Sequence, residues 1–210
     1  MATDHEGTRL SADEAMARLI EGNQRFLRGE ARSSAFRRES LADLAKAQRP
    51  YATIIGCSDS RVPPEWIFDA GLGELFVIRV AGNIFSPAIA GTVEYAGSYL
   101  GTPLFLVLGH EGCGAVAAAL ATKHLGEQFR SRVQLLLAKL VPGLPDRDPT
   151  LSIEEQASRA VESNVRWTVH QILDSPEGRA RVAEGRMKIV GAVYEIETGR
   201  VRVLPPEERT

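Results

Sequence analysis

The chain has 210 residues, of which 44% are hydrophobic and 25% charged, and its 25 basic and 27 acidic side chains leave a formal net charge of −2. This length and composition are typical of one globular domain and exclude a disordered or fibrous protein. Because the charges balance and no apolar stretch approaches the roughly 20 residues of a membrane span, neither nucleic acid nor a membrane is expected as a partner.

The first 50 residues are expected to form a helical arm. The opening MATDHEGTRL lacks the charged, apolar and cleavage regions of a secretory signal, so we expect a cytoplasmic protein. Ser11 and Glu14 fit a capping box, and apolar residues follow them at helical spacing. Residues 27–50 predict the end of this helix, a loop and a short second helix. Since the apolar side of the first helix has no obvious cover, we expect residues 1–50 to pack on a partner subunit.

From Tyr51 onward the pattern becomes that of an α/β domain. Four short apolar runs bounded by glycine, proline or charged residues are typical of strands buried on both faces of a parallel sheet. These runs cover residues 51–56, 75–81, 103–109 and 188–194. Helical patterns lie between them, over residues 63–70, 88–100, 113–124, 129–140 and 152–173. The alternation predicts a doubly wound sheet flanked by helices.

The C-terminal segment predicts one further strand. A turn is expected around Glu197–Arg200, and the alternating residues after it end at Pro205. We expect this strand to be antiparallel and to lie at an edge. The predicted fold class is α/β, with a mostly parallel central sheet of four strands, an antiparallel edge strand and flanking helices. The sheet belongs to residues 51–210, which form a single domain together with the N-terminal arm.

The two cysteines follow predicted strands. Cys57 comes directly after the first strand, and Cys113 comes three residues after His110, at the end of the third. In an open α/β sheet, ligands bind at the carboxyl ends of the strands. If the first and third strands are neighbours, with the second on the other side of the first, these three side chains converge. A cysteine or a histidine alone is more often structural, but this joint placement favours a metal site.

Two thiolates and an imidazole are ligands that suit zinc, and three protein ligands leave its fourth tetrahedral position for water or substrate. Such an open site is catalytic in type, because zinc lowers the pKa of bound water to about 7 and makes hydroxide available at neutral pH. Cys113 also begins a predicted helix, whose N-terminal amides favour the thiolate.

Asp59 and Arg61 follow Cys57 closely and allow two states of this site. Turned to Arg61, the carboxylate of Asp59 stays ionised and accepts a hydrogen bond from zinc-bound hydroxide. Turned to the metal, the same carboxylate closes the fourth position and quenches water activation. Alternatively, Asp59 and Arg61 form a surface salt bridge that has no role at the metal. The sequence leaves the choice between the two states open.

With these motifs, the chain resembles the β-class carbonic anhydrases over nearly its whole length. The segments that carry the resemblance are EGNQRF (21–26), CSDSRVPPE (57–65), GELFVIRVAGN (73–83), GTVEYA (91–96), GHEGCGAV (109–116) and GAVYEIETGRV (191–201). The resemblance implies a zinc lyase, a carbonate dehydratase that reversibly hydrates carbon dioxide to bicarbonate and a proton. It implies one zinc per subunit on Cys57, His110 and Cys113, and an Asp59–Arg61 pair that orients or gates the fourth position.

The resemblance also implies a narrow substrate cleft at the interface of a homodimer, or of a tetramer of dimers. The residues that it places around the cleft, some of them from the partner subunit, are Gln48, Phe76, Ala81, Tyr95 and Gly114. Many relatives carry valine at the position of Ala81. Carbon dioxide is apolar, so an aromatic pocket suits it, and Gln48 is expected to donate to a substrate oxygen.

Two alternative functions stay open at this point. One is hydrolysis of carbonyl sulfide or carbon disulfide on the same fold, although enzymes of that kind tend to carry Met-Asp where this chain has Ser58 and Asp59. The other is a non-catalytic zinc protein whose metal is closed by Asp59. A nucleotide-binding domain is not indicated, because no glycine-rich phosphate loop follows the first strand.

Overall fold

A computed structural model describes residues 10–31, 41, 42 and 44–206 of the chain. Its centre is a five-stranded sheet in the order β2-β1-β3-β4-β5. The strands are β1 (Ala52–Gly56), β2 (Leu75–Arg79), β3 (Leu104–His110), β4 (Lys188–Tyr194) and β5 (Val201–Val203). The first four are parallel and β5 is antiparallel to β4. The α/β fold class and the antiparallel edge strand are confirmed.

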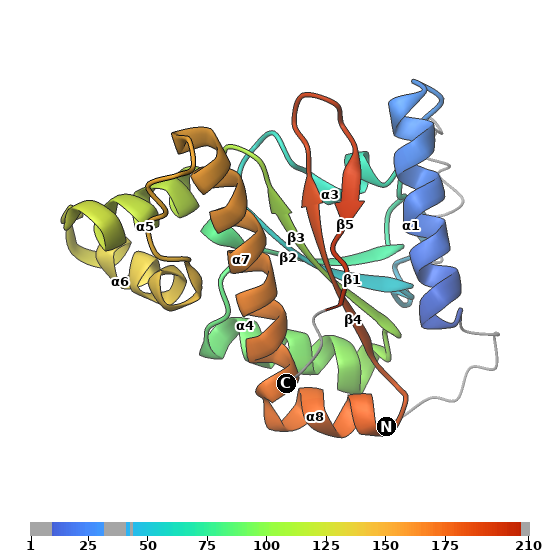
Figure 1. The fold of residues 1–210 in the computed structure, drawn as a ribbon. Helices are drawn as coiled ribbons and strands as arrows, with labels where there is room; N and C mark the ends of the chain where they lie inside the picture. The colour runs from blue at the N-terminus through green and yellow to red at the C-terminus, as the bar shows by residue number, and fades with distance from the viewer. Residues whose placement is uncertain (1–9, 32–40, 43, 207–210) are drawn as a thin grey trace.

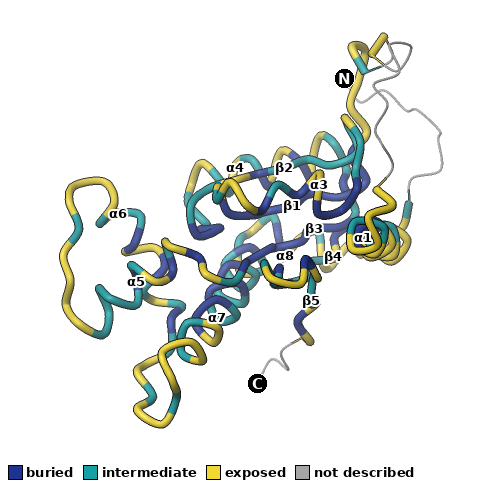
Figure 2. Tube along the Cα trace, turned by 90° about the horizontal axis from the view of Figure 1, so that it is seen from above, coloured by how far each residue is buried: buried dark blue, intermediate teal, exposed yellow. Residues whose placement is uncertain are grey.

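Helices cover both sides of this sheet. They are α1 (Ala12–Leu27), α3 (Pro64–Ile67), α4 (Pro87–Tyr95), α5 (Gly114–Leu125), α6 (Ser131–Leu140), α7 (Ile153–Asp174) and α8 (Pro176–Ala183). In Figure 1, α1 lies on one side of the strands and α5, α6 and α7 lie on the other. Strands β1 and β3 are buried along their whole length, as the dark blue trace in Figure 2 shows. Their apolar, unbroken sequences are explained by this burial on both faces.

Helix α7 approaches the sheet closely at the strand that carries His110. A Cβ atom on Gly109 would lie 2.5 Å from a methyl group of Val165 and 3.3 Å from one of Val161. Only glycine leaves room for this contact. The close approach brings polar side chains of α7 near the carboxyl ends of the strands.

Some predicted elements differ from the structure. The helix expected over 63–70 ends at Ile67, because Asp69 has a φ of 45° that an α-helix does not continue through. The helix expected over 88–100 is α4 followed by a π-helical turn at Ala96–Leu100. Helix α8 was not expected at all.

Helix α8 begins with a proline that sequence reasoning treats as a helix breaker. Pro176 stands at the first helical position, where its missing N–H costs nothing. The Ser175 hydroxyl accepts a hydrogen bond from the Gly178 N–H at 3.0 Å and caps the helix. In the sequence, Ser175 followed by Pro176 is therefore the pattern that indicates the start of this helix.

The N-terminal arm contacts its own chain through α1. The predicted capping box of Ser11 and Glu14 is present. The side chain of Asn23, only 5% exposed, donates to the carbonyls of Ile67 (3.2 Å) and Gly199 (2.9 Å). It also accepts from the N–H of Val201 at 3.0 Å. Packing of residues 1–50 on a partner subunit stays a prediction; the loop and second helix expected in that region fall partly at residues 32–40 and 43, outside the described residues.

Replacement of Asn23 by alanine is expected to destabilise the fold without touching the chemistry. Three backbone groups from distant segments lose their partner, at a cost of about 1–3 kcal/mol for each group left buried and unpaired. Chemical denaturation should show a lower free energy of unfolding for Asn23→Ala than for the wild type. An unchanged denaturation midpoint would show that α1 is not anchored by this side chain.

Candidate metal centre

Three potential metal ligands meet at the carboxyl ends of two neighbouring strands. Strands β1 and β3 pair in parallel, with Gly56 opposite Leu108. Cys57 therefore follows β1 beside His110, the last residue of β3. Cys113 is the N-cap residue of α5, one short turn further along the chain. The expected strand order, with β2 on the outer side of β1, is the one observed.

The geometry of the three side chains fits a divalent metal ion. The two Sγ atoms are 4.0 Å apart, and the ligand atoms of Cys57, His110 and Cys113 all lie within 4.8 Å of one another. Two thiolates on a tetrahedral zinc with bonds of about 2.3 Å would be about 3.8 Å apart. All three residues are buried, with exposures of 5%, 1% and 4%.

His110 is oriented for a ligand by its own backbone neighbourhood. Its Nδ1 lies 2.8 Å from the Glu111 carbonyl oxygen, an atom that only accepts, so the proton sits on Nδ1. The lone pair of the neutral ring is then on Nε2, which is buried and has no hydrogen-bond partner among the described residues. A buried acceptor without a partner is costly, and a metal ion satisfies it.

The electrostatics of the two thiols also favour a cation. The contact between the two thiols lowers the pKa of Cys57, and the same contact, together with burial, raises the pKa of Cys113. The pair thus holds one negative charge easily, whereas a second charge at 4.0 Å in a buried site is repelled. A divalent cation removes this repulsion, so its binding releases the second proton.

Asp59 is turned to Arg61. The guanidinium donates from Nε to Oδ1 at 2.9 Å and from a terminal nitrogen to Oδ2 at 2.7 Å, and the Arg61 N–H donates to Oδ1 at 3.0 Å. These contacts lower the pKa of Asp59 well below its usual range. One carboxylate oxygen still lies 3.9 Å from Nε2 of His110. Of the two states that the sequence left open, the structure has the one in which the carboxylate faces the arginine.

Comparison with known proteins identifies the family. The sequence model described as carbonic anhydrase matches residues 52–201. Among solved structures, a tetrameric β-carbonic anhydrase from the ascomycete Sordaria macrospora is similar, with a TM-score of 0.73 and 28% identity. The alignment covers 80% of this chain and 87% of that one. The chain belongs to the β-carbonic anhydrase family.

Curated relatives agree with this assignment. Carbonic anhydrase 2 of Mycobacterium tuberculosis is 39% identical over 184 residues, which cover 87% of each protein. The carbonic anhydrase of Mycolicibacterium smegmatis is 37% identical over 187 residues, 88% of this chain and 89% of that protein. Carbonic anhydrases are zinc lyases, so this chain is an enzyme of reversible carbon dioxide hydration with zinc as its cofactor, as the sequence motifs implied.

The five residues expected around the carbonic anhydrase cleft are only partly brought together in one chain. Phe76 on β2 and Tyr95 at the end of α4 contact each other, with ring centroids 6.1 Å apart. Ala81 and Gly114 lie beside the site, in the turn after β2 and at the first residue of α5. Gln48 and Tyr95 are exposed. Their part in a cleft requires a second subunit and stays a prediction.

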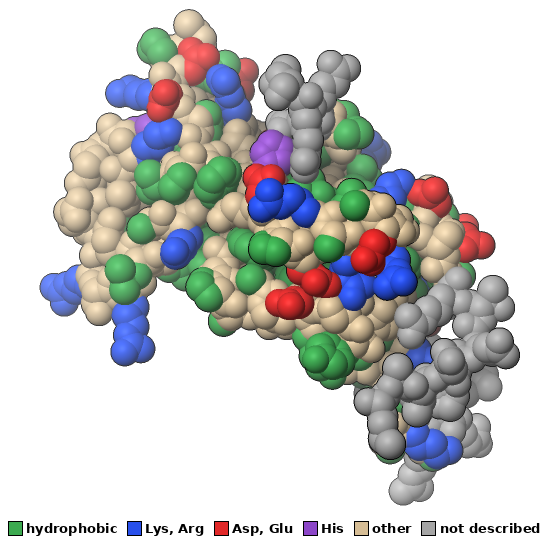
Figure 3. Space-filling view, turned by 90° about the horizontal axis from the view of Figure 1, so that it is seen from below, with side chains coloured by type: hydrophobic (Ala, Val, Ile, Leu, Met, Phe, Trp, Pro, Cys, Tyr) green, Lys and Arg blue, Asp and Glu red, His purple; other side chains and the backbone are tan. Residues whose placement is uncertain are grey.

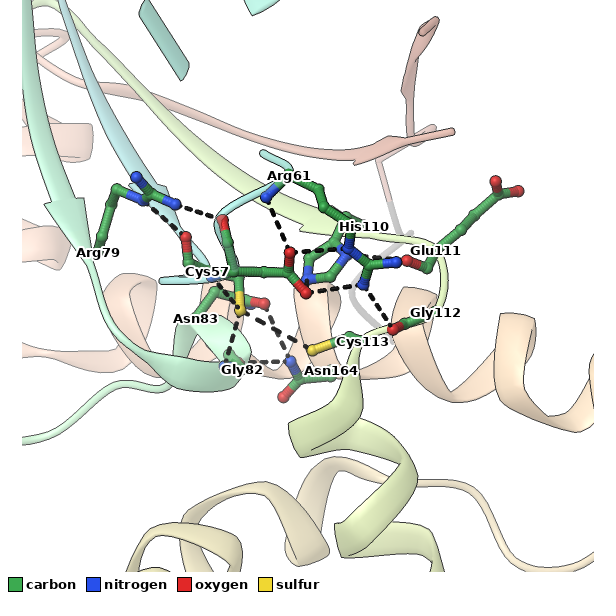
Figure 4. A network of polar contacts seen from close by, with 11 residues as sticks. Cys57, Arg61, Arg79, Gly82, Asn83, His110, Glu111, Gly112, Cys113 and Asn164 are labelled. Carbon is green, nitrogen blue, oxygen red and sulfur yellow. Dashed lines mark hydrogen bonds and ion pairs between the residues drawn. The ribbon is translucent and has the colours of Figure 1, made fainter. Parts of the chain in front are cut away.

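Two residues around the carbonic anhydrase site, Arg79 and Glu111, are given no role by the sequence, although Glu111 stands where many relatives carry a small residue. Arg79 donates from Nε to the Cys57 carbonyl at 2.8 Å and from a terminal nitrogen to the Asp59 carbonyl. It thereby fixes the backbone between the ligand and the carboxylate. The carboxylate of Glu111 points away from the metal ligands in Figure 4 and accepts from the Ile196 N–H at 3.2 Å. Glu111 thus anchors the turn after β3 to the segment between β4 and β5.

Proposed function

We propose that this chain hydrates carbon dioxide at one zinc per subunit held by Cys57, His110 and Cys113, with Asp59 and Arg61 as the residues that orient the attacking water. The observation that carries the proposal is the convergence of two buried thiols and one buried imidazole nitrogen within 4.8 Å. Three ligands of this kind leave a fourth position open, which is the pattern of catalytic rather than structural zinc.

The chain's own residues have distinct tasks in this reaction. When bound, zinc lowers the pKa of a coordinated water to about 7 and so supplies a nucleophile at neutral pH. Arg61 keeps the Asp59 carboxylate ionised, so with zinc in place Asp59 would accept a hydrogen bond from a water in the fourth position and orient it towards the substrate. The Nδ1–H of His110, bonded to the Glu111 carbonyl, holds the imidazole in the tautomer that presents Nε2.

The apolar side chains assigned to the cleft suit the substrate. Carbon dioxide carries no charge, so it needs a dry pocket rather than a charged clamp. Phe76 pairs with Thr53, away from the thiols of its own chain, so its ring and that of Tyr95 are proposed to supply aromatic surface to the cleft shared with the partner subunit. A Cβ atom on Gly114 would meet nothing within 4 Å, so the chain is open beside Cys113. Gln48 is proposed to donate its amide N–H to a substrate oxygen, from the partner subunit where the cleft is shared.

A homodimer, or a tetramer built from dimers, is proposed as the working assembly. Tyr95 is 45% exposed and Tyr99 is 77% exposed in the single chain, and their rings stack at 5.3 Å between centroids. Such exposed aromatic surface is typical of an interface. The Sordaria macrospora enzymes are described as tetrameric, which supports the same assembly here.

A cytoplasmic location is proposed together with small-molecule substrates and no membrane or nucleic-acid partner. No helix in the described part of the chain is long and apolar enough to cross a bilayer. On the face shown in Figure 3, basic and acidic side chains are interspersed with apolar ones and form no extended basic area. A nucleic-acid surface would require such an area.

Stopped-flow measurement on the zinc-loaded protein tests this function. Rapid acidification on mixing with carbon dioxide is expected at about pH 7 to 9, together with its loss after zinc is removed by a chelator. Carbonyl sulfide and carbon disulfide serve as competing substrates in parallel assays. Faster turnover of either sulfur compound would reassign the substrate, and a zinc-loaded protein inactive with all three gases would indicate a structural site.

A further inference from the structure

A strained turn lies directly against the metal ligands. The 3₁₀ turn Ala81–Asn83 follows β2, and two successive residues in it have left-handed backbone conformations, Gly82 with a φ of 69° and Asn83 with a φ of 43°. Asparagine adopts this conformation more readily than most residues, but still at a cost that the surroundings must offset. Contacts from outside the turn must therefore stabilise this conformation.

Two side chains of helix α7 provide these contacts as hydrogen bonds. Asn164 and Thr168 are four residues apart, so they lie on the same face of the helix. The amide of Asn164 donates to the Gly82 carbonyl at 2.9 Å and to Oδ1 of Asn83 at 3.3 Å. The hydroxyl of Thr168 donates to the Asn83 carbonyl at 3.1 Å. All of these bonds are buried, with Asn164 at 1% exposure and Thr168 at 0%.

In the conformation that α7 stabilises, the turn contacts the sulfur of Cys57. The Gly82 N–H donates to Sγ at 3.4 Å, and the Asp59 N–H makes the second contact of the same length. A Cβ atom on Gly82 would lie 3.1 Å from methyl carbons of Leu140 and 3.2 Å from Ala115, so the turn is enclosed on its far side. Figure 4 shows the continuous path from Asn164 through Gly82 to Cys57.

We propose that Asn164 and Thr168 are positioning residues of the metal site, which hold the Gly82–Asn83 turn so that the Gly82 N–H donates to the sulfur of Cys57. An N–H donor withdraws electron density from a thiolate, so this contact sets how strongly Cys57 donates to the metal. Neither side chain is among the residues that the family resemblance implied. The inference rests on the proposed metal site and adds a second layer of residues, supplied by α7, that determines the site's affinity.

Cobalt(II) substitution tests this inference without relying on activity. Thr168→Val removes the hydroxyl while keeping the side-chain shape, and Asn164→Leu removes the amide at similar volume. With the Gly82 N–H displaced, the thiolate-to-cobalt charge-transfer absorption is expected to move to longer wavelength in both variants. Loss of the N–H donor makes the thiolate a stronger donor but leaves its sulfur less firmly placed, and we expect the loss of placement to dominate. Zinc affinity, measured by competition with a chelator, should therefore fall about 10- to 100-fold in Asn164→Leu and less in Thr168→Val.

Asn23→Ala is the matched control, because Asn23 is another buried asparagine that ties three backbone groups together and has none of the three candidate ligands among its hydrogen-bond partners. It should lower stability while leaving the cobalt spectrum and the zinc affinity unchanged. Wild-type spectra and affinities in both α7 variants, or an equal change in Asn23→Ala, would overturn the inference. If Asn164→Leu fails to fold, Thr168→Val decides alone. A wild type without thiolate-to-cobalt absorption would instead refute the proposed metal site itself.

Discussion

Replacing either cysteine by alanine is expected to abolish zinc binding and carbon dioxide hydration together. In the proposed site, Cys57 and Cys113 each supply one of three ligands, and a site with one thiolate and one imidazole binds zinc far more weakly. The zinc content measured after dialysis should fall from roughly one ion per chain in the wild type to near none in either variant. Stopped-flow turnover should fall to the rate of the uncatalysed reaction.

Loss of zinc must be distinguished from loss of the fold. Thr53→Val provides the comparison, because Thr53 is also buried in β1, at the strand's other end, where its hydroxyl lies 2.8 Å from that of Thr102. This variant should keep its zinc. Circular dichroism should show intact secondary structure for all three proteins. A cysteine variant that folds and retains a full complement of zinc would contradict the ligand assignment.

Replacement of Asp59 by alanine is expected to leave zinc in place and to reduce turnover. The carboxylate faces Arg61 and lies 3.9 Å from Nε2 of His110, so in the proposed mechanism it orients the water without holding the ion. Loss of such an orienting group reduces activity by about 10- to 100-fold. Zinc content and kcat, measured on the same preparation, separate this role from that of the ligands.

A distant carboxylate controls for the change in charge. Asp148 also lies near an arginine, with its Oδ2 3.5 Å from Arg159, and is not part of the site. Asp148→Ala should have wild-type kcat. If Asp59→Ala also turned over at the wild-type rate from about pH 7 to 9, Asp59 would have no part in the mechanism.

The sequence predicted the parts of the molecule that depend on local pattern. Unbroken apolar runs identified β1 and β3, and the residues directly after them identified Cys57, His110 and Cys113 as a possible ligand set. The strand order followed from the need to bring these three together, and the structure has that order. Helix α8 was missed because its first residue, Pro176, reads as a breaker unless Ser175 is recognised as a cap.

Contacts between distant segments were not predictable in the same way. Asn164 lies 82 residues from Gly82 in the chain. In the sequence of an amphipathic helix, nothing distinguishes it from the other polar residues. Arg79 stands at the end of an edge strand, where a charged residue is ordinary. Only the packing of α7 and β2 around Cys57 gives these side chains a role.

The most direct test of the central claim is X-ray absorption at the zinc edge of the purified, active protein. The account predicts two sulfur ligands at about 2.3 Å and one imidazole nitrogen at about 2.0–2.1 Å, with one further light atom completing a tetrahedron. A zinc shell without two sulfurs, in a protein that hydrates carbon dioxide, would contradict the account.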